Sequence, residues 1–364
     1  MAKIKDFTTD QTMSAENAST GEDVDRLQGM LERFGYLRPG SYEHGTFDAK
    51  TERAVRKYQR FTGLTVDGVA GPKTKSHIIQ PRCVHQDSPG GSTAGAYSTY
   101  PAYTTKNLSY CFINNPADLD ANAAKNEIRA QFAKWQAVSH LKFTEVTATQ
   151  NPTFRISWHS GDHGDGEPFD GPGNTLAHAF YPPPMGGTHA GEMHFDEDET
   201  FSLDGSGGTY SVGAVALHEI GHLIGLAHSQ VQDAVMYPYY DVNKTTLRQD
   251  DINGVRDLYG IMFTHTASLS DSLGAAGESD TWQLSNVIAG DMNVVLDGPD
   301  NADFDLYVKF NATASEENFD YRSWTAGDEE LVIIGHPAGY ASFHVVSYEG
   351  SGNYSLVVQA TLNQ

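Results

Sequence analysis

The chain has 364 residues, which suggests two or three domains, because single hydrophobic cores rarely grow beyond about 250 residues. Its 47 acidic residues against 24 basic ones give a formal net charge of −23, which argues against nucleic acid and anionic membranes as partners. No apolar run approaches the roughly 20 residues that span a bilayer, and none follows the basic N-terminus, so we expect neither a membrane span nor a visible signal peptide.

The first part of the sequence predicts a tail followed by a small helical domain. Residues 1–21 are polar and irregular, and we expect them to be disordered. Within residues 22–80, Val24, Leu27 and Leu31 fall at helical spacing, and a second helix follows before a Gly-Pro turn and a third, short helix. We therefore expect three helices in this domain.

Residues 81–95 connect this domain to the rest of the chain. They contain Cys83, one of only two cysteines, which could act as a soft thiolate ligand for zinc, pair with Cys111, or be an inert buried thiol. Two cysteines exclude a disulfide framework. The small residues of 88–97 predict a flexible linker of the kind that proteases cut.

Residues 96–262 interleave strand and helix patterns, which predicts an α/β domain. Residues 108–113 and 154–158 are typical of strands, and between them Ile128, Phe132 and Trp135 mark one face of an amphipathic helix.

The segment His218–His228 contains the strongest chemical signal. His218 and His222 are four residues apart, so on a helix they project from one face and can bind the same zinc ion. Glu219 is placed to polarise a water at the metal, and Gly225 tolerates the sharp turn that returns His228 as a third ligand. Three imidazoles leave one tetrahedral position open, as in catalytic zinc sites. A chance match on an amphipathic helix is expected at a rate on the order of 10⁻⁴.

The spacing H-E-x-x-H-x-x-G-x-x-H resembles that of metzincin metallopeptidases, and Ala234–Pro238 resembles the methionine turn of their matrixin (matrix metalloproteinase) branch. The resemblance implies a mixed twisted sheet with three helices, and a substrate pocket, S1′, formed by Ala214, Met236, Tyr237, Pro238 and Tyr239. Because Ala214 is small, we expect this pocket to be deep and to favour a hydrophobic P1′ residue such as leucine.

The same resemblance implies two further metal sites. The ligands implied for a structural zinc ion are His163, Asp165, His178 and His194. Carboxylate and backbone oxygens suit Ca²⁺, and the ligands implied for calcium are Asp170, Gly171, Gly173, Thr175, Asp196 and Glu199. A closed four-ligand zinc site should stabilise the domain rather than react.

Residues 22–80 resemble the peptidoglycan-binding-like module that forms the matrixin pro-domain, and Pro81–Asp87 resembles the matrixin cysteine switch. This implies that Cys83 occupies the open zinc position in a latent zymogen, with Arg82 and Asp87 paired. The sequence departs from the family at Val84, where glycine is usual, and at Gln86, where proline is usual.

Residues 263–364 contain short alternating runs at 293–296, 304–308, 331–334, 341–346 and 354–358. These runs predict an antiparallel β-sandwich. The domain resembles the C-terminal pre-peptidase domain of secreted bacterial proteases.

Together these patterns predict a secreted, monomeric zinc endopeptidase zymogen that binds Zn²⁺ and Ca²⁺. Glu219 would be the general base, proteins or peptides the substrates, and the chain's own pro-domain the inhibitor. One alternative is a peptidoglycan-binding wall protein or wall-remodelling peptidase. Another is a metal-stabilised adhesive module, which does not explain Glu219.

Overall fold

The computed structural model describes residues 7, 11–87, 97–260, 265–324 and 329–362. The chain forms two compact units, Met1–Gly260 and Ile261–Gln364. Among the described helices, none combines the length and apolar character needed to cross a membrane. Most of the predicted linker, residues 88–96, lies outside the described residues.

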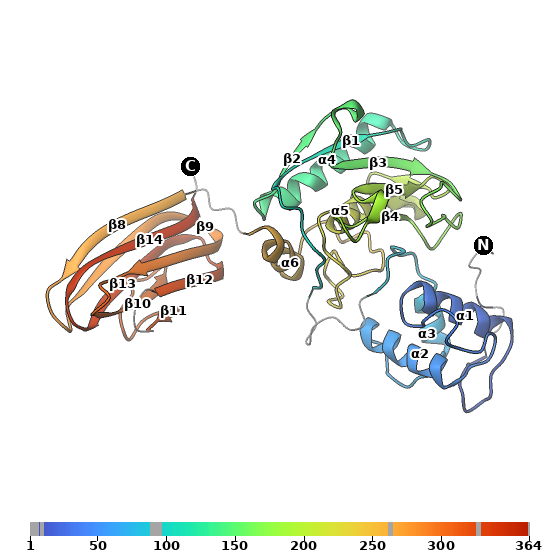
Figure 1. The fold of residues 1–364 in the computed structure, drawn as a ribbon, viewed down its shortest axis with the longest axis horizontal. Helices are drawn as coiled ribbons and strands as arrows, with labels where there is room; N and C mark the ends of the chain where they lie inside the picture. Colours follow the sequence, from blue (N-terminus) through green and yellow to red (C-terminus); the bar gives the residue numbers. More distant parts are fainter. Residues whose placement is uncertain (1–6, 8–10, 88–96, 261–264, 325–328, 363–364) are drawn as a thin grey trace. The chain divides into compact units, whose positions relative to one another are not determined.

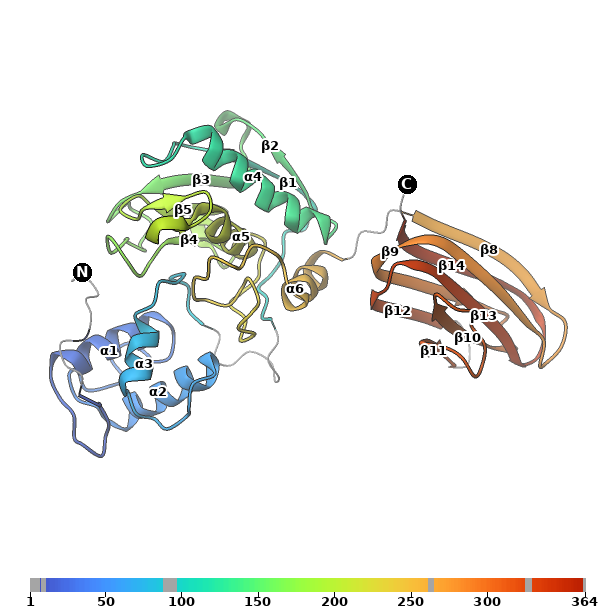
Figure 2. The ribbon, with the colours of Figure 1, turned by 180° about the vertical axis from the view of Figure 1, so that it is seen from behind.

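The N-terminal module contains the three predicted helices, which pack together in Figures 1 and 2. Their bounds are α1 Glu22–Arg33, α2 Ala49–Thr62 and α3 Pro72–Ile78. The side chain of Asp48 caps α2 by accepting from Lys50 N and Thr51 N, and Gly63 ends it at a φ of 73°. Buried apolar residues of α1 and α2, such as Leu27 and Val55, form the core of the module.

Part of the N-terminal tail is ordered against this module, so the prediction of a disordered 1–21 segment is wrong for residues 11–21. Met13 N donates to Ala70 O at 3.2 Å, Ala70 N donates to Met13 O at 2.9 Å, and Met13 is only 4% exposed. Burial of the apolar Met13 side chain, together with these two hydrogen bonds, fixes this part of the tail on the module.

The central domain is built on a five-stranded sheet of order β2-β1-β3-β5-β4, in which only β4 is antiparallel to its neighbour. The strands are β1 Asn107–Phe112, β2 Lys142–Glu145, β3 Phe154–His159, β4 Ala177–Ala179 and β5 Glu192–Asp196. A separate parallel pair joins β6 Phe201–Ser202 to β7 Tyr210–Ser211. The helices are α4 Ala121–Ala137, α5 Val212–Leu223 and α6 Gln249–Tyr259. The mixed sheet and three helices agree with the predicted arrangement.

Helices α4 and α5 pack against each other and share one apolar cluster with the sheet. Phe132 of α4 stacks on Tyr110 of β1 at a centroid distance of 4.3 Å. Trp135 of α4 donates its indole N–H to Leu217 O of α5 at 2.9 Å. These contacts fix α5, the helix that carries His218 and His222, against the sheet.

The C-terminal unit is one antiparallel sheet of seven strands, with the order β11-β10-β13-β9-β14-β8 and with β12 paired to β9. The strands are β8 His265–Leu273, β9 Ser279–Asp297, β10 Asp303–Phe310, β11 Tyr321–Ser323, β12 Glu329–His336, β13 Gly339–Glu349 and β14 Gly352–Leu362. Hydrogen bonds connect all seven strands, because the long strand β9 pairs with β13 through its first half and with β12 and β14 through its second.

All five runs predicted as strands lie within strands of this unit. Strand β8 was not predicted, since its sequence is dominated by short polar residues, and only Leu273 is fully buried. Its partner β14 supplies the backbone hydrogen bonds that the side-chain pattern does not reveal.

Gly221→Ala should destabilise the central domain by about 1–3 kcal/mol, because overpacked cores must shift to accept an extra methyl group. A Cβ at Gly221 would collide with Met236 Sδ and lie 3.2 Å from the Trp135 ring. The matched control is Gly29→Ala in α1, where nothing lies within 4 Å of the added carbon. Thermal unfolding of both variants measures the difference, and equal melting temperatures would contradict the packing argument.

Candidate metal centre and switch segment

Helix α5 is the platform of the centre. Ser211 caps its start by accepting from Ala214 N at 3.2 Å, and its interior is almost entirely buried. After the helix ends, Gly225 adopts a φ of +101°, which reverses the chain and brings His228 back beside the helix. The structure therefore brings together the three histidines that the motif predicted.

The ring nitrogens of His218, His222 and His228 converge with the sulfur of Cys83. One ligand atom from each lies within 4.8 Å of the others. The Nε2 atoms of His218 and His222 are 3.1 Å apart, and the buried Nε2 of His228 has no hydrogen-bond partner. Three inward-pointing lone pairs and a thiol are a donor set that fits zinc.

The opposite nitrogen of each ring is occupied. The Nδ1 atom of His218 donates to Val235 O, and that of His222 donates to Leu226 O, both at 2.7 Å. With Nδ1 as the donor, Nε2 stays unprotonated and faces the centre. The Nδ1 atom of His228 has a different kind of partner, the carboxylate of Asp87, at 2.8 Å.

Burial keeps these imidazoles neutral. It lowers the pKa of His218 to about 3 and holds the pKa values of His222 and His228 well below their usual range. Burial also raises the pKa of Glu219 to about 8, and Glu219 Oε2 is buried without a hydrogen-bond partner. A buried carboxyl group of this kind is stabilised either by a nearby cation or by taking up a proton.

Cys83 is a free, buried thiol, as is Cys111, so the disulfide considered as an alternative does not form. Burial raises the pKa of the Cys83 thiol, and the neighbouring carboxylate of Glu219 adds to this effect. A cation at the centre would be needed to favour the thiolate.

The backbone of Pro81–Asp87, which we call the switch segment, is held from both sides. Arg82 N donates to Asn174 O at 2.7 Å, and Cys83 N donates to Pro238 O at 3.1 Å. Tyr240 N donates to Pro81 O at 3.0 Å. The segment thus joins the loop after β3 to the loop after the methionine turn, although Val84 and Gln86 depart from the family pattern.

A buried ion pair closes the switch segment on itself. Arg82 Nη2 lies 2.7 Å from Asp87 Oδ1, and both side chains are almost completely buried. The guanidinium also lies 3.8 Å from the centroid of the Phe34 ring, and Tyr36 OH donates to Asp87 Oδ2 at 2.7 Å. The helical module therefore holds the segment through Phe34 and Tyr36, which follow α1.

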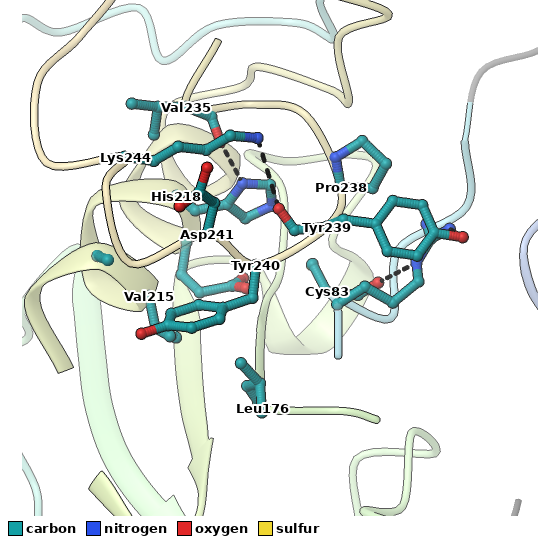
Figure 3. Close-up of a pocket in the computed structure, with 13 residues that line it drawn as sticks. Cys83, Leu176, Val215, His218, Val235, Pro238, Tyr239, Tyr240, Asp241 and Lys244 are labelled. Atoms are coloured by element: carbon teal, nitrogen blue, oxygen red, sulfur yellow. Dashed lines mark hydrogen bonds between the residues drawn. The ribbon is translucent and has the colours of Figure 1, made fainter. Parts of the chain in front are cut away.

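A small cavity of about 30 Å³ lies beside the centre, and Figure 3 shows its lining. Of the predicted pocket residues, Ala214, Pro238 and Tyr239 line it. Met236 and Tyr237 do not line it. Met236 is fully buried below α5, and Tyr237 packs into the core of the helical module.

Lys244 also lines the cavity, although it was not predicted. Its ammonium group donates to Tyr239 O at 3.4 Å (Figure 3). It also lies 4.5 Å from the centroid of the Tyr237 ring. Burial lowers its pKa to about 8. No spacing rule in the sequence connects this loop residue to the pocket.

The methionine turn is held by a carboxylate of α6. Asp251 accepts from Val235 N and from Met236 N, each at 2.9 Å. Since Asp251 is fully buried, these hydrogen bonds are protected from water. The floor of the centre therefore depends on the last helix of the domain.

His85 is a residue of the centre that the sequence reasoning missed. Its ring lies 4.5 Å from that of His222 and 4.7 Å from that of Tyr181, and its Nε2 bonds to Ala179 O on β4. Its position two residues after Cys83 was the available signal. His85 fills space in the cleft while the switch segment is seated.

A second cluster contains all four residues predicted for the structural zinc site, whose ligand atoms lie within 4.8 Å of one another. Asp165 Oδ2 lies 2.7 Å from His163 Nε2, 2.8 Å from His178 Nε2 and 2.8 Å from His194 Nδ1. Burial lowers the pKa of His194 to about 3, so its ring is neutral at physiological pH. Three rings and one carboxylate around one point fit a closed zinc site.

The residues predicted to bind calcium lie close together in two loops. Gly173 N donates to Glu199 Oε1 at 2.6 Å, and Asp170 and Asp196 each have a buried carboxylate oxygen without a hydrogen-bond partner. Burial raises the pKa of Asp196 and of Glu199 to about 7, with the other acidic groups adding to it. Gly171 and Gly173 have φ values of +77° and +88° and shape the first loop, which ends at Thr175.

Comparison with known proteins places this architecture in a family. Residues 102–260 match the family model of matrixins, and residues 20–78 match that of a putative peptidoglycan binding domain. Karilysin from Tannerella forsythia is 44% identical over 183 residues, which cover 50% of this chain and 37% of karilysin. Interstitial collagenase from Equus caballus is 37% identical over 242 residues, covering 66% of this chain and 50% of the collagenase.

The relationship extends across most of one further relative. Metalloendoproteinase 2-MMP from Arabidopsis thaliana is 32% identical over 281 residues, which cover 66% of this chain and 72% of that protein. The chain belongs to the matrixin family of zinc metalloendopeptidases. Matrixins depend on zinc and carry structural calcium, in agreement with the predicted cofactors.

Asp165→Asn should remove the ion from the second cluster, because the carboxylate is the only anionic ligand among three neutral rings. We expect the zinc content to fall by about one ion per chain and Tm to fall by about 5 °C or more. Asp162→Asn is the matched control, since this exposed side chain only accepts from Gly164 N. Elemental analysis and thermal unfolding test both; unchanged zinc content in Asp165→Asn would refute the assignment.

Proposed function

We propose that the chain is a secreted zinc endopeptidase, made as a latent and monomeric zymogen, that hydrolyses peptide bonds in proteins. The observation that carries this proposal is the convergence of His218, His222 and His228 beside the buried Glu219, with Cys83 on the remaining side. The chain spans less than half of karilysin, so activity on proteins is inferred from the centre itself and from family membership.

Zinc bound by the three imidazoles would lower the pKa of a water molecule and polarise the substrate carbonyl. Glu219 accepts the proton of the attacking water and then passes it to the leaving amine nitrogen. Burial raises the pKa of Glu219 above its usual range, which favours uptake of the proton, and a bound cation would favour the carboxylate that accepts it. The Nδ1 hydrogen bonds of His218 and His222 hold the rings in place during the reaction.

Latency follows from the position of the switch segment. Cys83 would occupy the ligand position that the water needs, and Arg82 lines the cavity where a substrate side chain would bind. Cutting the linker at 88–97 would let the segment leave. The helical module also bonds to the loop after the methionine turn, which borders the cavity. One of these hydrogen bonds joins Tyr58 OH and Tyr239 OH at 2.7 Å.

The second cluster would hold a structural zinc ion through His163, Asp165, His178 and His194. Calcium would bind between the two acidic loops, through Asp170, Asp196 and Glu199 and the backbone oxygens of Gly171, Gly173 and Thr175. The closely spaced, buried carboxylates and the raised pKa of Asp196 support a divalent cation here.

For specificity, the small side chain of Ala214 takes up little of the cavity, and Val215 and Leu176 give it an apolar lining. We infer a preference for a hydrophobic P1′ residue. A survey of cleavage sites in a peptide library tests this inference, and a majority of charged P1′ residues would refute it.

Residues 20–78 favour a second candidate function, because they match a putative peptidoglycan binding domain. The module would then bind the bacterial wall in addition to guarding the centre. Sedimentation of the full-length chain with purified peptidoglycan tests this, since a module that serves only as an inhibitor stays in the supernatant.

Glu219→Ala should lower kcat/KM on a quenched fluorescent peptide by at least about 10²-fold, because the general base is lost while the imidazoles remain. Zinc content and thermal unfolding provide the control and should match those of the parent. An active Glu219→Ala chain with its zinc retained would eliminate Glu219 as the base.

Cys83→Ser should make the full-length chain active without cleavage of the linker, because a neutral hydroxyl is a far weaker zinc ligand than a thiolate. The matched control is Cys111→Ser, which changes the other buried thiol on β1 and should stay latent. Peptide hydrolysis is followed beside electrophoresis of the intact chain. A Cys83→Ser chain that remains latent would rule out the switch.

A further inference from the structure

We propose that Asp87 is a positioning residue of the zinc site: the switch segment supplies the outer hydrogen-bond partner of His228 and thereby tightens metal binding in the latent chain. The proposal rests on the zinc site proposed above, but it does not require that Cys83 inhibits. It assigns the segment a second role, the retention of the metal.

His228 is distinguished from the other two rings by the origin of its partner. The Nδ1 atoms of His218 and His222 bond to backbone carbonyls of the central domain, which stay in place when the switch segment leaves. His228 Nδ1 bonds to a side chain that lies 141 positions earlier in the sequence. Only this ring therefore loses its partner on activation.

The Asp87–His228 contact has the geometry of a strong interaction. The Nδ1–Oδ1 distance is 2.8 Å, and both side chains are 0% exposed. A carboxylate that accepts from a ligating histidine fixes its tautomer and raises the basicity of the other nitrogen. Here the other nitrogen is the buried Nε2 that has no hydrogen-bond partner.

The rest of the network holds the Asp87 side chain in place. Arg82 pairs with it at 2.7 Å, and Tyr36 OH donates to its second oxygen at 2.7 Å. Because the charge of Arg82 compensates that of Asp87, the carboxylate can be buried next to a neutral imidazole. The Arg82–Asp87 pair therefore shapes the switch segment and also orients Asp87 Oδ1 toward His228 Nδ1.

Two different residues of one segment then act on the same ion. Cys83 acts directly, as a ligand, and Asp87 acts through His228. Loss of the segment exposes His228 Nδ1 to water, so the cleaved enzyme should release zinc faster than the latent chain even when the thiol contributes nothing.

The test measures transfer of zinc from the full-length chain to a chromogenic chelator, with Cys83 retained in every variant so that the switch segment stays seated. The kinetic phase that is absent in His228→Ala identifies the catalytic site. Asp87→Ala should accelerate this phase about 10–100-fold, the usual effect of losing such a partner, and Asp87→Asn, which still accepts a hydrogen bond, should be intermediate.

Tyr36→Phe is the matched control, because it removes a hydrogen bond from the other oxygen of Asp87 and leaves the His228 contact intact. It should release zinc at close to the parental rate. Equal acceleration in Tyr36→Phe and Asp87→Ala would overturn the proposal, since the effect would then be general loosening of the segment. An unchanged rate in Asp87→Ala would also overturn it.

A second measurement does not depend on whether Asp87→Ala weakens the seating of the segment. In the zinc-loaded parent, the Nδ1 proton of His228 should give a downfield nuclear magnetic resonance signal that disappears when residues 1–95 are removed. Absence of this proton signal from the parent would contradict the hydrogen bond itself. Neither measurement depends on catalysis, so a failure of the proposed peptidase activity is recognised separately.

Discussion

The central constraint on this molecule is the burial of three neutral imidazoles that point at one position. Removing such rings from water is favourable only if each polar nitrogen has a partner. Backbone carbonyls and one carboxylate satisfy the outer nitrogens, and a metal ion is the partner that fits the inner ones. The fixed turn at Gly225, the tight packing below α5 and the raised pKa of Glu219 all follow from meeting this requirement in a dry interior.

The switch segment likewise supplies hydrogen-bond partners to polar groups that line the cleft. An empty cleft would leave polar groups of two loops without partners, whereas the segment bonds to Asn174 O and Pro238 O and fills the space with His85. The helical module then holds the segment through Tyr36 and Tyr58. The contacts of the switch segment are therefore distributed over a surface, and Cys83 is the one among them that points at the three histidines.

The centre was predictable from sequence where chemistry imposes spacing. The catalytic motif can be read from the local sequence: two histidines four apart, a glycine at the turn and a third histidine. The second cluster was predictable through family resemblance. The contacts of Asp87 with His228 and of Tyr58 with Tyr239 have no local trace, because they depend on how a separate module docks. The motif fixes where the methionine turn lies in the sequence but not how deeply each of its side chains is buried; packing against Gly221 puts Met236 below α5. Strand β8 could not be predicted from its side chains, because backbone hydrogen bonds to β14 stabilise it.

The carboxylate of Asp251 has a practical consequence for dissecting the protein. It lies on α6, downstream of every residue that approaches the metal, yet it fastens the backbone of Val235 and Met236. A recombinant fragment trimmed just after the methionine turn would contain the histidines of both clusters and still lack the carboxylate that holds the turn below them. Minimal catalytic fragments should therefore extend through Tyr259, whose hydroxyl donates to Ile224 O at 2.8 Å and ties α6 to the end of α5.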